Sequence, residues 1–288
     1  MEQAGMTGPV EADVDRFRRE GVVVLRRAID RSWLNRLSRA LEDNMSNPGP
    51  MASDYTPDDG PGRYFGDYCN WQRIAGYRDF VTRSGVASMA ARLMGTRRVR
   101  FFHEHVLVKE PGTEEPTPWH HDLPYYVVDG TQVVSLWIPL DPVPEASCPQ
   151  FVSGSHRWGR LFYPRKFVDG SDYAYAGEDY QSLEEPDGFE PAVADLRSWS
   201  LEPGDAIAFH FLTVHNAPPN RTGLRRRAIA WRFLGDDVRW KNRPGTPSPP
   251  YPDMGLELPD GAALPEDWFP VIWSSGEVSH ADDNRVSS

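Results

Sequence analysis

Three residues of types that bind metals are spaced in a way that could bring them together: His120, Asp122 and His215. His120 and Asp122 lie two positions apart, and on a β-strand such residues point to the same face. An imidazole and a carboxylate would then project side by side into one cavity. With His215 as a third ligand, two histidines and one carboxylate would hold one face of a metal and leave positions open opposite. This ligand set is typical of non-haem Fe(II) oxygenases.

A His-x-Asp pair also occurs by chance, so the alternatives have to be weighed. An adjacent histidine and aspartate more often form a surface pair or a hydrogen-bonded group in the core. The other nearby histidines are weaker candidates. His121 should face the opposite side of the strand, and the odd spacing between His210 and His215 places His210 on the other face as well. We interpret His156 as a residue that holds a turn by hydrogen bonding.

The bulk composition predicts a soluble globular protein. The chain has 288 residues, of which 39% are hydrophobic and 25% charged, enough to bury a core in one large domain. The formal net charge is −11 and no basic face is evident, which argues against a nucleic-acid partner. No run approaches the roughly 18 apolar residues of a membrane span, so no membrane partner is expected. The oligomeric state is not readable from the sequence.

The cysteines and the N-terminus bear on the compartment. The chain has two cysteines, Cys69 and Cys148, and its first residues lack the basic start and apolar run of a signal peptide. Free thiols are the simpler interpretation, with a disulfide between the two as the alternative. We therefore expect a cytoplasmic protein.

Residues 1–98 are expected to support the fold with helices, a strand and a loop. A short helix should end at Gly21, a buried strand should follow at residues 22–25, and Asp30 should cap the next helix. Residues 46–62 are rich in Pro, Gly, Asp and Ser and should form a long loop, of a kind that often serves as a lid.

Residues 99–234 show a different pattern, with short strands separated by Pro and Gly turns. In the strand expected at residues 100–109, His103 and His105 share one face and Glu104 points to the other. Such strands, preceded by helices, predict a mainly β fold with flanking helices and a double-sheet jelly-roll core, the cupin-like double-stranded β-helix. A barrel of this kind has an open mouth where a metal and a small ligand can sit.

Two further segments are expected around this core. Residues 160–200 carry few regular signals and many Tyr, Asp and Glu residues, and we interpret them as an insertion near the site. Residues 235–288 should form a C-terminal surface segment, with a proline-rich stretch at 241–270 and a polar tail from Ser275. All of these belong to one domain of residues 1–288.

The chain resembles the phytanoyl-CoA dioxygenase family of Fe(II)/2-oxoglutarate-dependent oxygenases over about residues 13–234. Four segments carry the resemblance, and their order and spacing make it specific: Phe17–Val24, Pro118–Asp122, Phe151–His156, and Gly204–His215 followed by Asn220 and Arg226. The third segment departs from the family's Pro-Gly-Ser-His ending, because Ser153 replaces the proline.

The resemblance implies roles for four residues. His120, Asp122 and His215 would bind the iron. Arg226, placed where the family has its arginine after the distal histidine, would bind the far carboxylate of 2-oxoglutarate. A guanidinium suits that task because it can donate two parallel hydrogen bonds to a carboxylate.

The resemblance also implies a lining for the cosubstrate. Trp137 and His105 lie where the family lines this pocket, and Thr117 and Ser135 are weaker candidates. Ala217 stands where many members carry a hydroxyl group, so that contact would be missing or replaced.

The activity implied is that of a hydroxylase that uses Fe(II), dioxygen and 2-oxoglutarate, which is decarboxylated to succinate. It would hydroxylate or otherwise oxidise an unactivated C–H bond of a small-molecule substrate. Asp122 argues against a related halogenase, in which a small residue replaces the carboxylate. Dense aromatic and polar residues suggest the substrate mouth, although residues 63–73 could equally pack outside the sheet: Arg63, Tyr64, Tyr68, Trp71, Tyr125 and Tyr126.

Two other functions remain open at this point. One is a cupin-like metalloenzyme that does not use 2-oxoglutarate. The other is a non-catalytic, metal-dependent binding protein. Arg226 distinguishes the cupin-like enzyme from a 2-oxoglutarate-dependent oxygenase, because only the oxygenase needs a cation for the cosubstrate.

Overall fold

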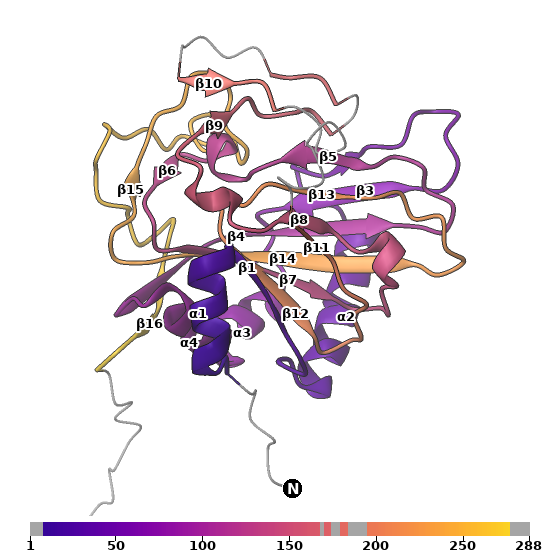
Figure 1. Ribbon diagram of the computed structural model, residues 1–288, viewed down its shortest axis with the longest axis horizontal. Coiled ribbons are helices and arrows are strands. Elements are labelled where there is room, and N and C mark those ends of the chain that lie inside the picture. The colour runs from indigo at the N-terminus through magenta and orange to yellow at the C-terminus, as the bar shows by residue number, and fades with distance from the viewer. Residues whose placement is uncertain (1–7, 168–169, 174–178, 184–194, 277–288) are drawn as a thin grey trace, which may run out of the picture.

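The computed structural model describes residues 8–167, 170–173, 179–183 and 195–276. In this part of the chain a small antiparallel sheet lies over a large one, and the helices cover the other face of the large sheet (Figure 1). Three layers result, and the candidate site residues come from the two facing sheets. The predicted mainly β jelly-roll fold with flanking helices is confirmed.

The large sheet supplies the floor of the site. Its central strands are almost fully buried, because the helices cover one face and the small sheet the other. The strand order is β1 (Val22–Leu25), β12 (Ala206–Phe209), β7 (Val133–Pro139), β14 (Arg226–Leu234), β4 (Arg98–Lys109), β3 (Tyr64–Tyr68) and β2 (Ser53–Asp54), with β16 (Val271–Ser274) also paired to β4.

The small sheet supplies the opposite wall. Its order is β11 (Leu196–Arg197), β8 (Gln150–Val152), β13 (His215–Ala217) and β5 (Thr117–His120). Shorter elements connect the sheets: strand pairs β9 (Leu161–Phe162) with β10 (Tyr180–Gln181) and β6 (Val128–Asp129) with β15 (Arg239–Trp240), and 3-10 turns η1 (Leu123–Tyr125), η2 (Glu145–Ser147) and η3 (Ser155–Arg157).

The helices follow the sequence signals. The first, α1 (Glu11–Glu20), ends at Gly21, whose φ of 74° is the left-handed conformation that glycine adopts without strain. The second, α2 (Arg31–Ser46), begins after Asp30, whose carboxylate accepts hydrogen bonds from two backbone N–H groups of the first turn. Two shorter helices follow, α3 (Ala75–Arg83) and α4 (Val86–Met94).

The C-terminal segment differs from the prediction. Residues 241–270 do not simply lie on the surface, because Tyr251 and Phe269 are only 3% and 0% exposed. Both rings pack against Phe102 of β4 and form a second apolar cluster at that end of the sheet. The prolines signalled a loop, and the aromatic residues among them bury that loop. The tail expected from Ser275 lies almost wholly outside the described residues.

Cys69 and Cys148 are free thiols, as predicted. Within the described ranges, no helix combines the length and the apolar character needed to cross a bilayer. The expected insertion at 160–200 falls partly outside the described residues, and its described part includes β9, β10 and β11.

Candidate metal centre and its two cavities

The small sheet and the turn that follows β5 bring His120, Asp122 and His215 together. One ligand atom from each lies within 4.8 Å of the others, and all three residues are buried. Oδ1 of Asp122 is 3.5 Å from Nε2 of His120 and 3.8 Å from Nε2 of His215. His120 of β5 and His215 of β13 are direct cross-strand partners, which explains why their rings lie only 4.3 Å apart.

Asp122 reaches the site by a different route from the one predicted. Strand β5 ends at His120, and Asp122 has helical backbone angles (φ −71°, ψ −38°) at the start of η1. The expectation that both residues share a strand face is therefore wrong in detail, and a tight turn after His120 brings the carboxylate back. His121 does point away, because its Nε2 accepts a hydrogen bond from the Phe162 N–H at 3.0 Å.

Backbone carbonyls orient both imidazoles. Nδ1 of His120 lies 2.8 Å from the Pro118 oxygen, and Nδ1 of His215 lies 2.8 Å from the Thr213 oxygen. A carbonyl only accepts hydrogen bonds, so each Nδ1 carries the proton and each Nε2 lone pair faces the centre. Burial, followed by the neighbouring His120, lowers the pKa of His215 to about 3, which keeps this ring neutral and able to bind a metal.

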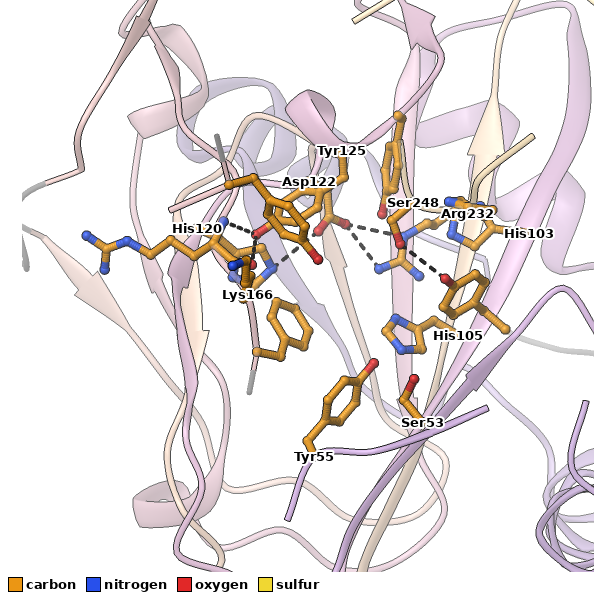
Figure 2. Close-up of a pocket in the computed structure, with 16 residues that line it drawn as sticks. Ser53, Tyr55, His103, His105, His120, Asp122, Tyr125, Lys166, Arg232 and Ser248 are labelled. Atoms are coloured by element: carbon orange, nitrogen blue, oxygen red, sulfur yellow. Dashed lines mark hydrogen bonds and ion pairs between the residues drawn. The ribbon is translucent and has the colours of Figure 1, made fainter. Parts of the chain in front are cut away.

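Arg232 is a site residue that the sequence reasoning missed. Its Nε and Nη2 atoms both lie 3.3 Å from Oδ2 of Asp122, the oxygen that does not face the histidines (Figure 2). Burial alone would raise the pKa of Asp122, but Arg232 and then the two histidines hold it well below its usual range. The carboxylate is therefore charged and turned with one oxygen toward the centre. Arg232 lies six residues after Arg226, and this even spacing on a strand was the available signal.

One cavity of about 270 Å³ opens from His120 and Asp122. Asp122 is the single carboxylate among its described lining residues, and Phe167 and Pro249 are the two that lack a polar side-chain group. The lining comes from both sheets and from the C-terminal segment (Figure 2): Ser53, Tyr55, Tyr68, His103, His105, His120, Asp122, Tyr125, Tyr126, Arg165, Lys166, Phe167, Tyr173, Arg232, Ser248 and Pro249.

The polar groups of this cavity are mostly uncharged. Burial lowers the pKa of His105 to about 3 and that of His103 well below its usual range, so both rings are neutral. Nδ1 of His103 and Nε2 of His105 are buried without a hydrogen-bond partner in the described chain. On the opposite wall, the Phe167 and Tyr125 rings lie 5.1 and 5.7 Å from His120.

A second, narrower cavity of about 50 Å³ leads from the same centre along the large sheet. Its walls are mainly apolar, and Phe151 and Phe209 pack against the His215 ring at 5.6 and 4.7 Å. Its lining consists of His105, Leu107, Thr117, His120, Trp137, Pro149, Phe151, Phe167, Phe209, His215, Asn216, Ala217, Ala230 and Arg232.

Five residues were expected near the cosubstrate. His105, Thr117 and Trp137 line the second cavity. Ser135 lies two residues before Trp137 on the same face of β7 and pairs with Arg232 of β14. Its hydroxyl is buried without a hydrogen-bond partner in the described chain. Arg226 is buried at the start of β14, two strand steps beyond Ala230 on the same face.

The six residues expected at the substrate mouth divide into two groups. Tyr68, Tyr125 and Tyr126 line the first cavity. The structure places the other three elsewhere: Tyr64 is buried with its hydroxyl 2.8 Å from Thr117, Arg63 pairs with Asp54 at the surface, and Trp71 packs against Phe101 in the core. Tyr64 and Tyr68 share a face of β3 and differ in their position along it: Tyr64 pairs with Lys109, whereas Tyr68 pairs with His105, which lines the cavity.

The three side chains are ligands that suit Fe(II). Two imidazoles and one carboxylate lie on one side of a point that opens into both cavities, and open-sided non-haem iron sites have this arrangement. Carbonyls hold the outer nitrogens of the histidines and a guanidinium holds the outer oxygen of the carboxylate.

Comparisons with known proteins agree with this geometry. The chain is 28% identical over 180 residues to a probable phytanoyl-CoA dioxygenase of Caenorhabditis elegans, with 58% of this chain and 54% of that protein covered. This chain spans about half the length of most of the curated relatives it matches.

Solved structures share the fold. The carbocyclase SnoK from nogalamycin biosynthesis, described as non-haem and α-ketoglutarate dependent, has a TM-score of 0.72 at 23% identity, covering 93% of this chain and 99% of its own. The epimerase SnoN, solved with Fe3+, α-ketoglutarate and nogalamycin RO, has a TM-score of 0.68 at 22% identity, covering 91% and 98%. The profile of the phytanoyl-CoA dioxygenase (PhyH) family matches residues 17–228, most of the chain. The chain therefore belongs to the phytanoyl-CoA dioxygenase family.

Proposed function

We propose that the protein is an Fe(II)- and 2-oxoglutarate-dependent dioxygenase that oxidises a C–H bond of a small molecule. The observation that carries this proposal is the buried triad of His120, Asp122 and His215, open on one side to two cavities. When bound there, iron with 2-oxoglutarate and dioxygen would supply the oxidising power that an unactivated C–H bond requires, with decarboxylation to succinate.

The residues of the chain would divide the remaining work. The triad would hold the metal through one oxygen of Asp122, because Arg232 contacts the other. The second cavity suits an elongated dicarboxylate that reaches from the metal toward Arg226. Trp137, Phe151 and Phe209 would exclude water along this path, which strengthens the electrostatic attraction at its end.

The first cavity would hold the substrate against the metal. Aliphatic side chains other than Pro249 are absent from its described lining, so a long alkyl chain finds little matching surface. Neutral imidazoles and several tyrosines instead offer hydrogen bonds and flat ring surfaces. We therefore expect a compact, oxygenated substrate, and hydroxylation is the simplest outcome at a site that retains its carboxylate ligand.

Product analysis tests this function. A library of small oxygenated compounds is incubated aerobically with iron-loaded protein and 2-oxoglutarate, and succinate and substrate oxidation are followed by mass spectrometry. The proposal expects one succinate for each oxidised product and the loss of both in Asp122→Ala. Substrate oxidation without consumption of 2-oxoglutarate would contradict it.

A further inference from the structure

Two buried cations lie directly opposite each other beyond the second cavity. Arg226 of β14 and Lys109 of β4 are cross-strand partners, and they are only 6% and 1% exposed. Side chains in this relation have Cβ atoms about 4.5–5.5 Å apart, and like charges there are destabilising. Burial adds the cost of removing both charges from water. A sheet does not gain stability from such a pair.

Neither cation has an ion-pair partner in the described part of the chain. The Lys109 ammonium donates to the carbonyls of Glu115, Ala217 and Pro218, at 2.7, 3.3 and 3.3 Å. Arg226 donates to the carbonyls of Ser147 and Pro218.

These carbonyls satisfy hydrogen bonds but carry no net charge, so two positive charges remain close together. The Glu115 carboxylate acts on the Lys109 charge without forming an ion pair with it. Burial, followed by Arg226, holds the pKa of Lys109 well below its usual range, as expected for a cation that lacks a counter-ion.

An aromatic ring and two hydroxyl groups surround the two cations. The Tyr64 ring lies 4.4 Å from the Lys109 ammonium, and Tyr64 is the Cα partner of Lys109 on its other side. The Tyr64 hydroxyl is 2.8 Å from that of Thr117, which lines the second cavity. Thr117 is also paired with Ala217, so it offers a hydroxyl from the facing strand at the position where Ala217 has none.

We propose that Lys109 is a second cation for the distal carboxylate of the cosubstrate, so that Lys109 and Arg226 act together as one anion receptor. The inference rests on the proposed function. A carboxylate between the two would remove their mutual repulsion and compensate both charges. Arg226 would provide the directed hydrogen bonds. Lys109 would contribute a second positive charge, and both cations share the Pro218 carbonyl as a hydrogen-bond acceptor.

Calorimetric titration into anaerobic, Mn(II)-loaded protein tests the role of Lys109. Two probes are used: 2-oxoglutarate, and 2-oxovalerate, which carries a methyl group in place of the distal carboxylate. In Lys109→Met the dissociation constant for 2-oxoglutarate should rise about tenfold or more, while that for 2-oxovalerate stays within about twofold. Lys109→Arg should recover much of the lost affinity.

Matched controls separate the outcomes. Arg225→Met removes a neighbouring cation that points to the other face, where it pairs with Glu42 and Glu110, and should leave both titrations unchanged. Equal weakening of both probes in Lys109→Met would assign the lysine a structural role and overturn the inference, as would unchanged affinity for 2-oxoglutarate. Failure of the wild type to bind 2-oxoglutarate would instead overturn the proposed function.

Discussion

Arg232 shows how one residue links the metal centre to the substrate side. It contacts the outer oxygen of Asp122 and lines both cavities. A carboxylate held in this way presents one oxygen to a metal and leaves room for other ligands. Without Arg232, the buried Asp122 carboxylate would be free to rotate or to bind a metal with both oxygens.

We predict that Arg232→Met weakens Mn(II) binding by about 10–100-fold, the usual cost of losing a residue that orients a metal ligand. Calorimetry at neutral pH measures this, with circular dichroism to confirm folding. Arg227→Met is the matched control, since Arg227 lies on the same strand but pairs with Asp141 and Glu42 on the other face. Unchanged metal affinity in Arg232→Met would assign the guanidinium to the substrate cavity alone.

The placement of residues at the site could be predicted only in part from the sequence. The side chains of His120 and His215 were expected to meet, and the structure brings them together across two paired strands. Asp122 was placed on the wrong element, because a turn after a strand end can mimic strand spacing. The even spacing of Arg232 from Arg226 was a weak sequence signal, and Lys109 has no local motif. The contacts of both residues depend on burial and cross-strand register.

Strand β4 separates two environments by simple alternation. His103 and His105 face the cavity, while Glu104 points toward the helices and is fully buried. The Glu104 carboxylate accepts a hydrogen bond from the Asn70 N–H, and its other oxygen has no partner in the described chain. Burial raises the pKa of Glu104 to about 8, so the folded protein carries this group protonated at neutral pH.

A pH dependence of stability follows from Glu104. The folded state keeps the proton up to about pH 8, whereas the unfolded state loses it near the ordinary pKa of 4.5. Between these values the unfolded state binds fewer protons, so the contribution of Glu104 to the free energy of unfolding falls as pH rises. Glu104→Gln should therefore gain stability relative to wild type from about pH 5 to pH 8 in urea denaturation. A constant difference across this range would contradict the assignment.

The C-terminal segment provides a test of packing between elements. Phe269 is fully buried against Phe102 and Tyr251, although its proline-rich surroundings predicted a surface loop. Phe269→Ala should reduce the free energy of unfolding by roughly 3–5 kcal/mol. The control, Met254→Ala, changes a side chain that is 39% exposed and should alter it by less than about 0.5 kcal/mol. Similar values for both variants would restore the surface interpretation.

The elements themselves were largely readable from the sequence. Helix ends were marked by Gly21 and Asp30, and strand alternation assigned His103 and Glu104 to their faces. Segments whose structure depends on distant contacts were not readable. Residues 241–270 have no periodicity of their own, and their burial depends on the end of β4, which is far away in the sequence.

The whole molecule does not depend on a metal for its core. The main apolar cluster lies between the helices and the large sheet, on the face opposite the site. We expect the metal-free protein to stay folded. A free metal concentration of about 100 times the dissociation constant should add about 2.7 kcal/mol to the free energy of unfolding, or several degrees in Tm for a chain of this size.

Thermal unfolding with and without a chelator measures this gain in Tm, and the Tm of His215→Ala should be the same in both conditions. Global unfolding on chelation would contradict it.

The most direct test of the account is titration of 2-oxoglutarate into anaerobic, Fe(II)-loaded protein, beside His120→Ala and Arg226→Ala. The account predicts one binding site in the wild type. Binding should be lost in His120→Ala, because the metal is lost, and strongly weakened in Arg226→Ala, because the distal carboxylate loses its hydrogen-bonding partner. Absence of binding to well-folded, metal-loaded wild type would contradict the account and favour a metal protein that does not use 2-oxoglutarate.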